Sequence, residues 1–135
     1  MDEYHKAGIA INKTHIEYGE PSQQGGEIAM QRLLASAKPF SAVFVYNDAM
    51  AIGAMSTLED NGYKVPQSVS VIGFDDVLLS RYSRPKLTTL HYPIEMMAQE
   101  AALLSLGKVA NTGKLERGFK YIPHLVKRES TSIKS

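Results

Sequence analysis

Apolar residues along this chain follow two different spacings. Unbroken or alternating apolar runs are typical of strands, and apolar residues three or four positions apart are typical of one face of a helix. The strand-like patterns lie at residues 14–18, 42–46, 69–73, 87–91 and 119–126. The run at 42–46 is continuously apolar, which predicts a strand that is central in the sheet and buried on both faces, and residues 69–73 are predicted to form a second buried strand.

Helical spacing fills the stretches between these runs. One helix is predicted before residue 38, a second over residues 47–61 and a third over residues 94–106. The Asn-Gly pair at 61–62 and the glycine at 107 are residue types that end helices. Strands that alternate with helices in this way predict parallel βαβ units, with helices packed on both faces of the sheet. We therefore predict an α/β fold.

Length and charge narrow the class of protein. The chain has 135 residues, which fits one compact domain or one piece of a larger one. Its 15 Lys and Arg residues against 14 Asp and Glu residues leave a net charge of +1. A near-neutral chain lacks the broad basic face that binds phosphate backbones. We therefore expect this chain to make no direct contact with nucleic acid.

The residue types that the chain lacks bear on its compartment. It contains no cysteine, which excludes disulfides and cysteine nucleophiles and fits a reducing cytosol. Its apolar runs are far shorter than the roughly 20 residues that span a bilayer, so we expect no membrane segment. The first residues also lack the apolar core of a signal peptide. We therefore expect a cytoplasmic location.

Polar residues follow three of the predicted strands. They are Glu20 after the first, Asn47 and Asp48 after the second, and Asp75 and Asp76 after the third. Open α/β sheets bind ligands beyond the carboxyl ends of their strands. Carboxylates accept hydrogen bonds from hydroxyl groups, and an amide both donates and accepts, so the set suits a sugar or polyol. Helix capping and Asx turns explain the same residue types equally well, so spacing alone leaves both open.

Other kinds of chemistry find less support. The four histidines are too scattered for metal-ligand spacing. Gly25 and Gly26 precede a helix but lack the glycine pattern and lysine of a phosphate-binding loop. Asp75 and Asp76 would need further carboxylates and a phosphate substrate to hold magnesium. We therefore expect no catalytic residue, no metal site and no cofactor, and hence no enzyme.

Ordered blocks of sequence resemble the effector-binding domain of LacI-type bacterial transcriptional repressors. They are AVFVYNDAMAIGA at 42–54, SVIGFDD at 70–76, LTTL at 87–90 and LVKRES at 125–130. Further details are most similar to the galactose-responsive branch of that family, namely YGEP at 18–21, LSRYSRP at 79–85 and HYPI at 91–94. The resemblance covers essentially the whole chain.

The resemblance implies a periplasmic-binding-protein-like fold of type I, a sandwich built on a parallel sheet. Residues 1–135 would form part of the effector-binding domain, mainly its C-terminal subdomain, with residues 88–107 crossing to an N-terminal subdomain missing here. The crossing would leave Leu90, Ile94 and Met97 without their natural apolar partners. The headpiece that binds operator DNA would also be absent from this chain.

The resemblance also assigns roles to particular residues. Asn47 and Asp75 match positions that hold effector hydroxyls, and Glu20 is a hypothetical third sugar contact. Ile52 and Tyr82 match positions in a homodimer interface, although Ile52 is equally explained as a core residue. The expected effector is a small sugar, with galactose favoured. Binding it would shift the repressor off its operator.

Two alternatives stay open. A periplasmic sugar-binding protein of a transport system would have the same body with a signal peptide and no headpiece. A flavodoxin-like or other doubly wound α/β enzyme would use Asp75 as a metal ligand or as an acid-base residue. Turnover or a divalent-metal requirement would favour the enzyme.

Overall fold

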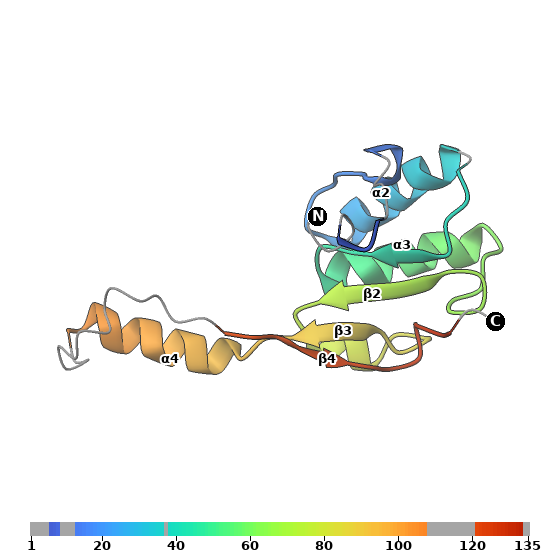
Figure 1. Cartoon of the computed structure of the whole chain (residues 1–135). Coiled ribbons are helices and arrows are strands. Elements are labelled where there is room, and N and C mark those ends of the chain that lie inside the picture. Colours follow the sequence, from blue (N-terminus) through green and yellow to red (C-terminus); the bar gives the residue numbers. More distant parts are fainter. Residues whose placement is uncertain (1–5, 9–12, 37, 108–120, 134–135) are drawn as a thin grey trace.

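Helices and strands alternate along the chain (Figure 1). The computed structural model describes residues 6–8, 13–36, 38–107 and 121–133. Its elements are the 3-10 turn η1 (Lys13–His15), α2 (Gln23–Ala35), β1 (Ala42–Phe44), α3 (Asp48–Asp60), β2 (Ser70–Phe74), the 3-10 turn η2 (Leu78–Arg81), β3 (Thr88–His91), α4 (Ile94–Ser105) and β4 (His124–Val126). The predicted α/β fold is confirmed.

The strands form one sheet in the order β1-β2-β3-β4. β1 and β2 are parallel, as are β2 and β3, whereas β4 is antiparallel to β3. The carboxyl ends of β1, β2 and β3 therefore lie at the same edge of the sheet. We call this edge the strand-end edge.

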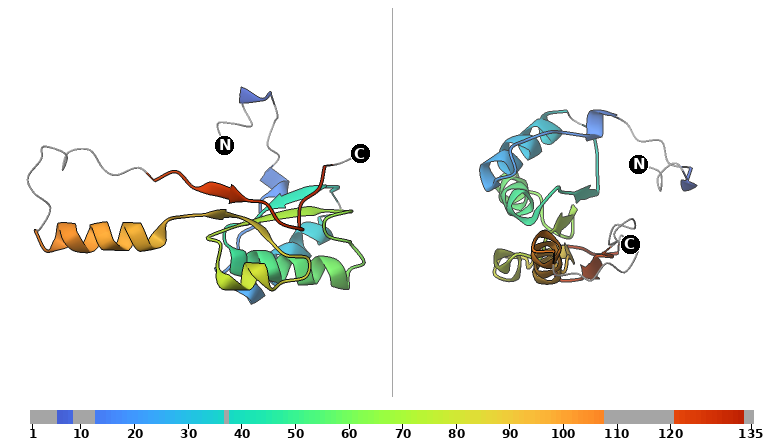
Figure 2. Two further views of the ribbon diagram at one scale, coloured as in Figure 1. Left: turned by 90° about the horizontal axis from the view of Figure 1, so that it is seen from below. Right: turned by 90° about the vertical axis from the view of Figure 1, so that its left-hand side faces the viewer.

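Helix α3 covers one face of the sheet, and α2 packs on α3 from the same side (Figure 2). The two helices touch backbone to backbone. A Cβ atom on Gly26 would lie 2.1 Å from the carbonyl oxygen of Met50, and one on Gly53 would lie 2.0 Å from that of Gln23. Glycine at both positions therefore allows the close contact, and a larger residue would force the helices apart.

Helix α4 stands apart from this body. It projects from the ends of β3 and β4, as Figure 1 and the left-hand view of Figure 2 show. None of its residues is buried, and Ile94 and Met96 are 52% and 53% exposed. Leu90 and Met97 are half-buried. An apolar helix with no buried residue lacks the packing that normally stabilises a helix in a protein.

The structure corrects the prediction for residues 14–18. Their alternation predicts a strand, but Lys13–His15 form a 3-10 turn, and the segment from Ile16 to Tyr18 pairs with no strand in the described part. Tyr18 is largely exposed. An alternating pattern is stable as a strand only where a neighbouring strand takes its backbone hydrogen bonds.

Three further predictions need correction within the described residues. The run at 42–46 was expected to be central, but β1 lies at the edge of the described sheet, and Phe44 is 61% exposed. Helices were expected on both faces, but α2 and α3 share one (Figure 2). The last strand was expected over 119–126, but β4 begins only at His124, and residues 119–120 lie outside the described part.

Candidate functional site at the strand-end edge

The predicted residues Asn47 and Asp75 lie at the same edge of the sheet. Asn47 follows β1 and Asp75 follows β2, and these strands are parallel neighbours. The loop of Glu20 approaches the same region through α2: a Cβ atom on Gly25 would lie 2.0 Å from the Glu20 carbonyl oxygen. Since α2 packs on the first turn of α3 through Gly26, the Glu20 loop lies near the helix that Asn47 begins.

Asn47 is the N-cap of α3. Its side-chain oxygen accepts a hydrogen bond from the backbone N–H of Met50 at 2.8 Å. This satisfies one of the N–H groups left without a partner at the start of a helix. The capping interpretation is therefore correct for the oxygen. Within the described residues, the NH2 group of this half-buried residue donates no hydrogen bond.

Asp75 has an unusual backbone conformation. Its φ is +108°, a region that residues with a side chain rarely adopt. Its backbone N–H donates to the carbonyl oxygen of Leu90 at 2.9 Å. No hydrogen bond or ion pair to its half-buried carboxylate forms within the described residues. Burial raises the pKa of this carboxyl above its ordinary value of 3.8.

The carboxylate of Asp76, the next residue, is buried and bound to other side chains of the protein. Its carboxylate is 5% exposed and pairs with Arg128, with His91 Nδ1 at 3.1 Å and with Arg81 Nη2 at 3.5 Å. Burial raises the pKa of Asp76, but the hydrogen bond and charge of Arg128, helped by His91 and Arg81, outweigh it and hold the pKa below 3.8. Asp76 is therefore ionised and fully partnered.

The carboxylate of Asp48 is also buried and hydrogen-bonded within the protein. It is completely buried, and its Oδ1 accepts from the Thr89 hydroxyl at 2.5 Å while its Oδ2 accepts from the Val77 N–H at 2.9 Å. Burial raises the pKa of Asp48, although these two hydrogen bonds lower it in part; the nearby charges of Asp75 and Asp76 raise it further. Asp48 is thus a structural link between α3, β3 and the turn after β2.

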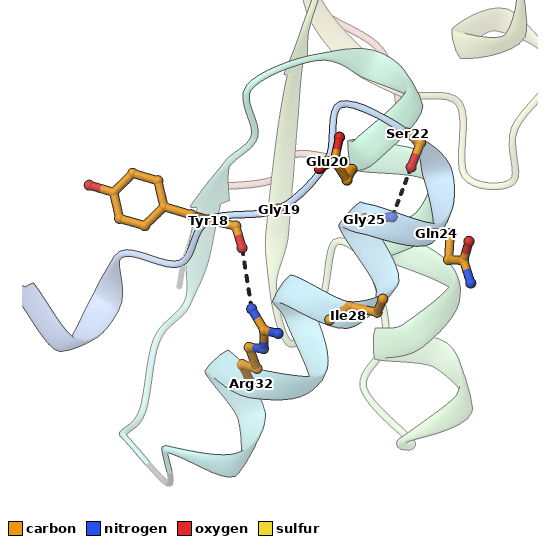
Figure 3. Close-up of a pocket in the computed structure, with 8 residues that line it drawn as sticks. All are labelled: Tyr18, Gly19, Glu20, Ser22, Gln24, Gly25, Ile28 and Arg32. Carbon is orange, nitrogen blue, oxygen red and sulfur yellow. Dashed lines mark hydrogen bonds between the residues drawn. The ribbon is translucent and has the colours of Figure 1, made fainter.

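Glu20 lies in different surroundings. It borders a surface hollow of about 490 Å³ along the outer side of α2. In Figure 3 the side chains of Tyr18 and Gln24 point away from one another, and Arg32 donates to the carbonyl oxygen of Tyr18. The polar groups around this hollow do not converge on a common point. Glu20 is exposed and keeps its carboxylate available.

An aromatic pair beside the strand-end edge was not singled out from the sequence. Phe74, which precedes Asp75, contacts Tyr92, which follows β3, with ring centroids 5.6 Å apart. The signal that would have found it is an aromatic residue adjoining each strand end. Rings at a polar site provide the apolar surface that a sugar ring can cover.

The predicted dimer residues differ in exposure. Ile52 on α3 is half-buried and packs against the core, as the core interpretation holds. Tyr82, directly after η2, is 69% exposed, and Leu78 and Leu79 within η2 are 66% and 55% exposed. The apolar surface of this region thus lies on η2 and Tyr82.

No group of three or more potential metal-ligating side chains occurs in the part of the chain that the structure describes. None of the helices described is long and apolar enough to cross a membrane.

The alternating α/β body with a polar strand-end edge defines the class of this protein. Residues 2–131 match the family model of the periplasmic binding protein-like domain, and the chain belongs to that family. The chain is 50% identical over 130 residues to the HTH-type transcriptional regulator GalR of Escherichia coli, covering 96% of this chain and 38% of GalR. It is 46% identical over 125 residues to GalS of Salmonella typhimurium, covering 93% of this chain and 37% of GalS.

Solved structures agree with these relatives. A sugar-binding transcriptional regulator of the LacI family from Escherichia coli, complexed with phosphate, aligns with a TM-score of 0.84 at 34% identity. The alignment covers 96% of this chain and 46% of that one. The resemblance to LacI-type regulators, and to their galactose branch, is confirmed. The chain spans less than half the length of these relatives.

Proposed function

We propose that this chain is the sugar-sensing and dimerising part of a transcriptional repressor of sugar metabolism, with galactose as its effector. The observation that carries the proposal is Asp75. Its carboxylate has no partner within the described residues and stands at the edge where α/β sheets bind ligands. The relatives GalR and GalS support the regulatory class and the galactose branch.

The chemistry of the edge suits vicinal hydroxyl groups. The Asp75 carboxylate accepts from two hydroxyls, and the NH2 group of Asn47 donates to a sugar oxygen. The rings of Phe74 and Tyr92 offer an apolar surface beside them. Glu20 contributes a further acceptor from the loop before α2. The burial that raises the pKa of Asp75 also strengthens each hydrogen bond to its carboxylate.

Regulation follows from linkage. A sugar that binds one arrangement of the protein more tightly shifts the population towards that arrangement and away from the operator-binding form. Moving the balance from 1:99 to 99:1 needs about 5.5 kcal/mol of differential affinity. One carboxylate supplies less than that, so several hydroxyl contacts must act together.

The domain arrangement belongs to the same proposal. Residues 1–135 act mainly as the C-terminal subdomain of an effector-binding domain, and residues 88–107 cross to an N-terminal subdomain. The exposed apolar side chains of α4 support a crossing, because that subdomain would cover them. Operator DNA is bound by a headpiece outside this chain, in the cytoplasm.

We also propose a homodimer that uses Ile52 and Tyr82. The exposed apolar side chains of Leu78, Leu79 and Tyr82 support it, since adjoining apolar surface favours association. The Tyr82→Ala variant of the intact protein is expected to be monomeric by analytical ultracentrifugation. An unaltered dimer would count against this interface. The transport-protein and enzyme alternatives gain no support from the relatives, which are transcriptional regulators.

The test of the sugar proposal is isothermal titration calorimetry on the intact protein. D-galactose is titrated with D-glucose beside it, and Asp75→Ala is the variant. We expect saturable heat with galactose that is lost in Asp75→Ala. No heat with either sugar would contradict the assignment of galactose and leave the fold unaffected.

A further inference from the structure

The turn after β2 holds two consecutive residues in an unfavourable conformation. Asp75 has φ +108° and Asp76 has φ +53°, and neither is glycine. A residue other than glycine in such a region is strained and persists only where its surroundings impose the conformation. Something in the structure must therefore hold this turn.

The backbone hydrogen bonds of the turn identify what holds it. The N–H of Asp75 donates to the carbonyl oxygen of Leu90, and the N–H of Asp76 donates to the Thr89 hydroxyl at 3.4 Å. The N–H of Val77 donates to Asp48 Oδ2. Thr89 in turn donates its hydroxyl proton to Asp48 Oδ1, so Asp48 and Thr89 together engage two of these three N–H groups.

The position of Asp48 is energetically unfavourable for a carboxylate. It is completely buried, and no ion pair to its carboxylate forms within the described residues. A carboxylate buried without a cation is unfavourable unless its hydrogen bonds compensate. The fold also leaves room for it, because a Cβ atom on Gly73 would lie 2.3 Å from Asp48 Oδ1. The carboxylate of Asp48 supplies two adjacent acceptors here, and an apolar side chain supplies none.

We propose that Asp48 is a positioning residue of the sugar site, which acts through Thr89 and Val77 to fix the backbone of the turn and hence the direction of the Asp75 carboxylate. This rests on the proposed function, since the affinity it controls is that for galactose. Asp48 touches no ligand itself. It sets the affinity because a carboxylate held in its binding geometry loses less conformational freedom when the sugar binds.

The test uses a matched pair of variants in the intact protein. Thr89→Val keeps the shape of the side chain but removes the hydroxyl that links Asp48 to Asp76, whereas Thr89→Ser keeps the hydroxyl and removes the methyl group. We expect galactose to bind Thr89→Val about tenfold more weakly and Thr89→Ser within about twofold of the wild type, as measured by calorimetry.

A role in stability alone is separated by two further readouts. Val69→Ala shortens a core side chain away from the turn and should lower the melting temperature while leaving the affinity of the folded protein unchanged. Amide hydrogen exchange at Asp76 and Val77 should be about tenfold faster in Thr89→Val than in Thr89→Ser. Equal galactose affinity in the two Thr89 variants would overturn the proposal.

The outcomes also separate this inference from the proposed function. If the wild type binds no galactose, the proposed function fails, and the role of Asp48 in sugar affinity fails with it. Unequal amide exchange in the two Thr89 variants would then still establish that Asp48 and Thr89 fix the turn. If the wild type binds galactose and Thr89→Val binds it equally well, only the positioning role of Asp48 is overturned.

Discussion

The turn after β1 and the turn after β2 both carry two neighbouring Asx residues, but the turns differ in how many side-chain polar groups are hydrogen-bonded within the protein. In each pair of Asx residues, the side chain of the second member, Asp48 or Asp76, is buried and fully hydrogen-bonded. The first residue, Asn47 or Asp75, is half-buried. Asn47 uses its side-chain oxygen to cap α3, whereas the Asp75 carboxylate has no partner within the described residues.

This difference separates stability from function at neighbouring positions. A residue whose polar atoms are all hydrogen-bonded within the protein has a structural role, and its replacement lowers the free energy of unfolding. A residue in a strained backbone conformation whose side chain makes no hydrogen bond does not stabilise the fold. Asp75 is therefore the residue of the strand-end edge that function explains best, and Asn47 is intermediate.

The largest expected effect is that of Asp76→Ala. It leaves Arg128, whose side chain is 13% exposed, without its carboxylate partner, and breaking such a pair costs about 3–5 kcal/mol. Urea unfolding measures the loss. Arg81→Ala is the matched control, because Arg81 is 58% exposed and its pair with Asp76 contributes about 0.5 kcal/mol. Equal losses of unfolding free energy in Asp76→Ala and Arg81→Ala would contradict the structural role of Asp76.

The same carboxylate predicts a dependence on pH. Because the pKa of Asp76 is lower in the folded protein than its ordinary 3.8, its contribution to stability is fully present above that value. It is lost as the pH falls below 3.8 through the folded pKa. The difference in unfolding free energy between wild type and Asp76→Ala should therefore shrink over this acid range. A difference that does not change with pH would contradict the ionised pair.

The second largest effect is on sugar affinity at Asp75. Asp75→Ala removes a charged acceptor for two hydroxyls and should weaken galactose binding by about a hundredfold. The free energy of unfolding should depend on backbone strain at this position. Asp75→Gly should be about 1 kcal/mol more stable than Asp75→Ala, because glycine adopts positive φ without strain. Thermal unfolding of both variants checks this. An alanine variant as stable as the glycine variant would show that the turn is unstrained.

Asn47 should show both kinds of effect, each smaller. Asn47→Ala removes the cap of α3 and costs about 1 kcal/mol of stability. Asn47→Asp keeps a capping oxygen but lacks the NH2 group, so it should retain stability while galactose binds about tenfold more weakly. Urea unfolding and calorimetry on the same samples separate the two. Wild-type affinity in Asn47→Asp would reduce Asn47 to a cap.

The smallest effect is expected at Glu20. Glu20→Ala removes an exposed carboxylate and should change stability by less than about 0.5 kcal/mol. Galactose affinity should fall about threefold, because a hydrogen bond made in contact with water has a small net value. Calorimetry with Glu20→Gln as the control measures it. Unchanged affinity would remove Glu20 from the site.

Local patterns predicted much of the fold and the first residue of each turn. The order of helices and strands follows from apolar spacing, and the cap at Asn47 follows from an Asx residue between a strand and a helix. The strand predicted at 14–18 failed because alternation says nothing about whether a neighbouring strand is present.

The fates of Asp48 and Asp76 could not be predicted locally. Asp48 binds Thr89, which lies 41 residues further along the chain, and Asp76 binds Arg128, which lies 52 residues further along. From the sequence, these two acids looked as available for a ligand as Asn47 and Asp75. Only the tertiary contacts show which member of each pair the fold has used.

The central claim is that the Asp75 carboxylate contacts sugar hydroxyls directly. The measurement that tests it is a titration of D-galactose and its 2-, 3- and 4-deoxy analogues into the wild type and into Asp75→Ala. We predict that at least one deoxy analogue binds the wild type about tenfold more weakly than galactose, and that this penalty disappears in Asp75→Ala. Penalties that are equal in the two proteins for all analogues would contradict the claim.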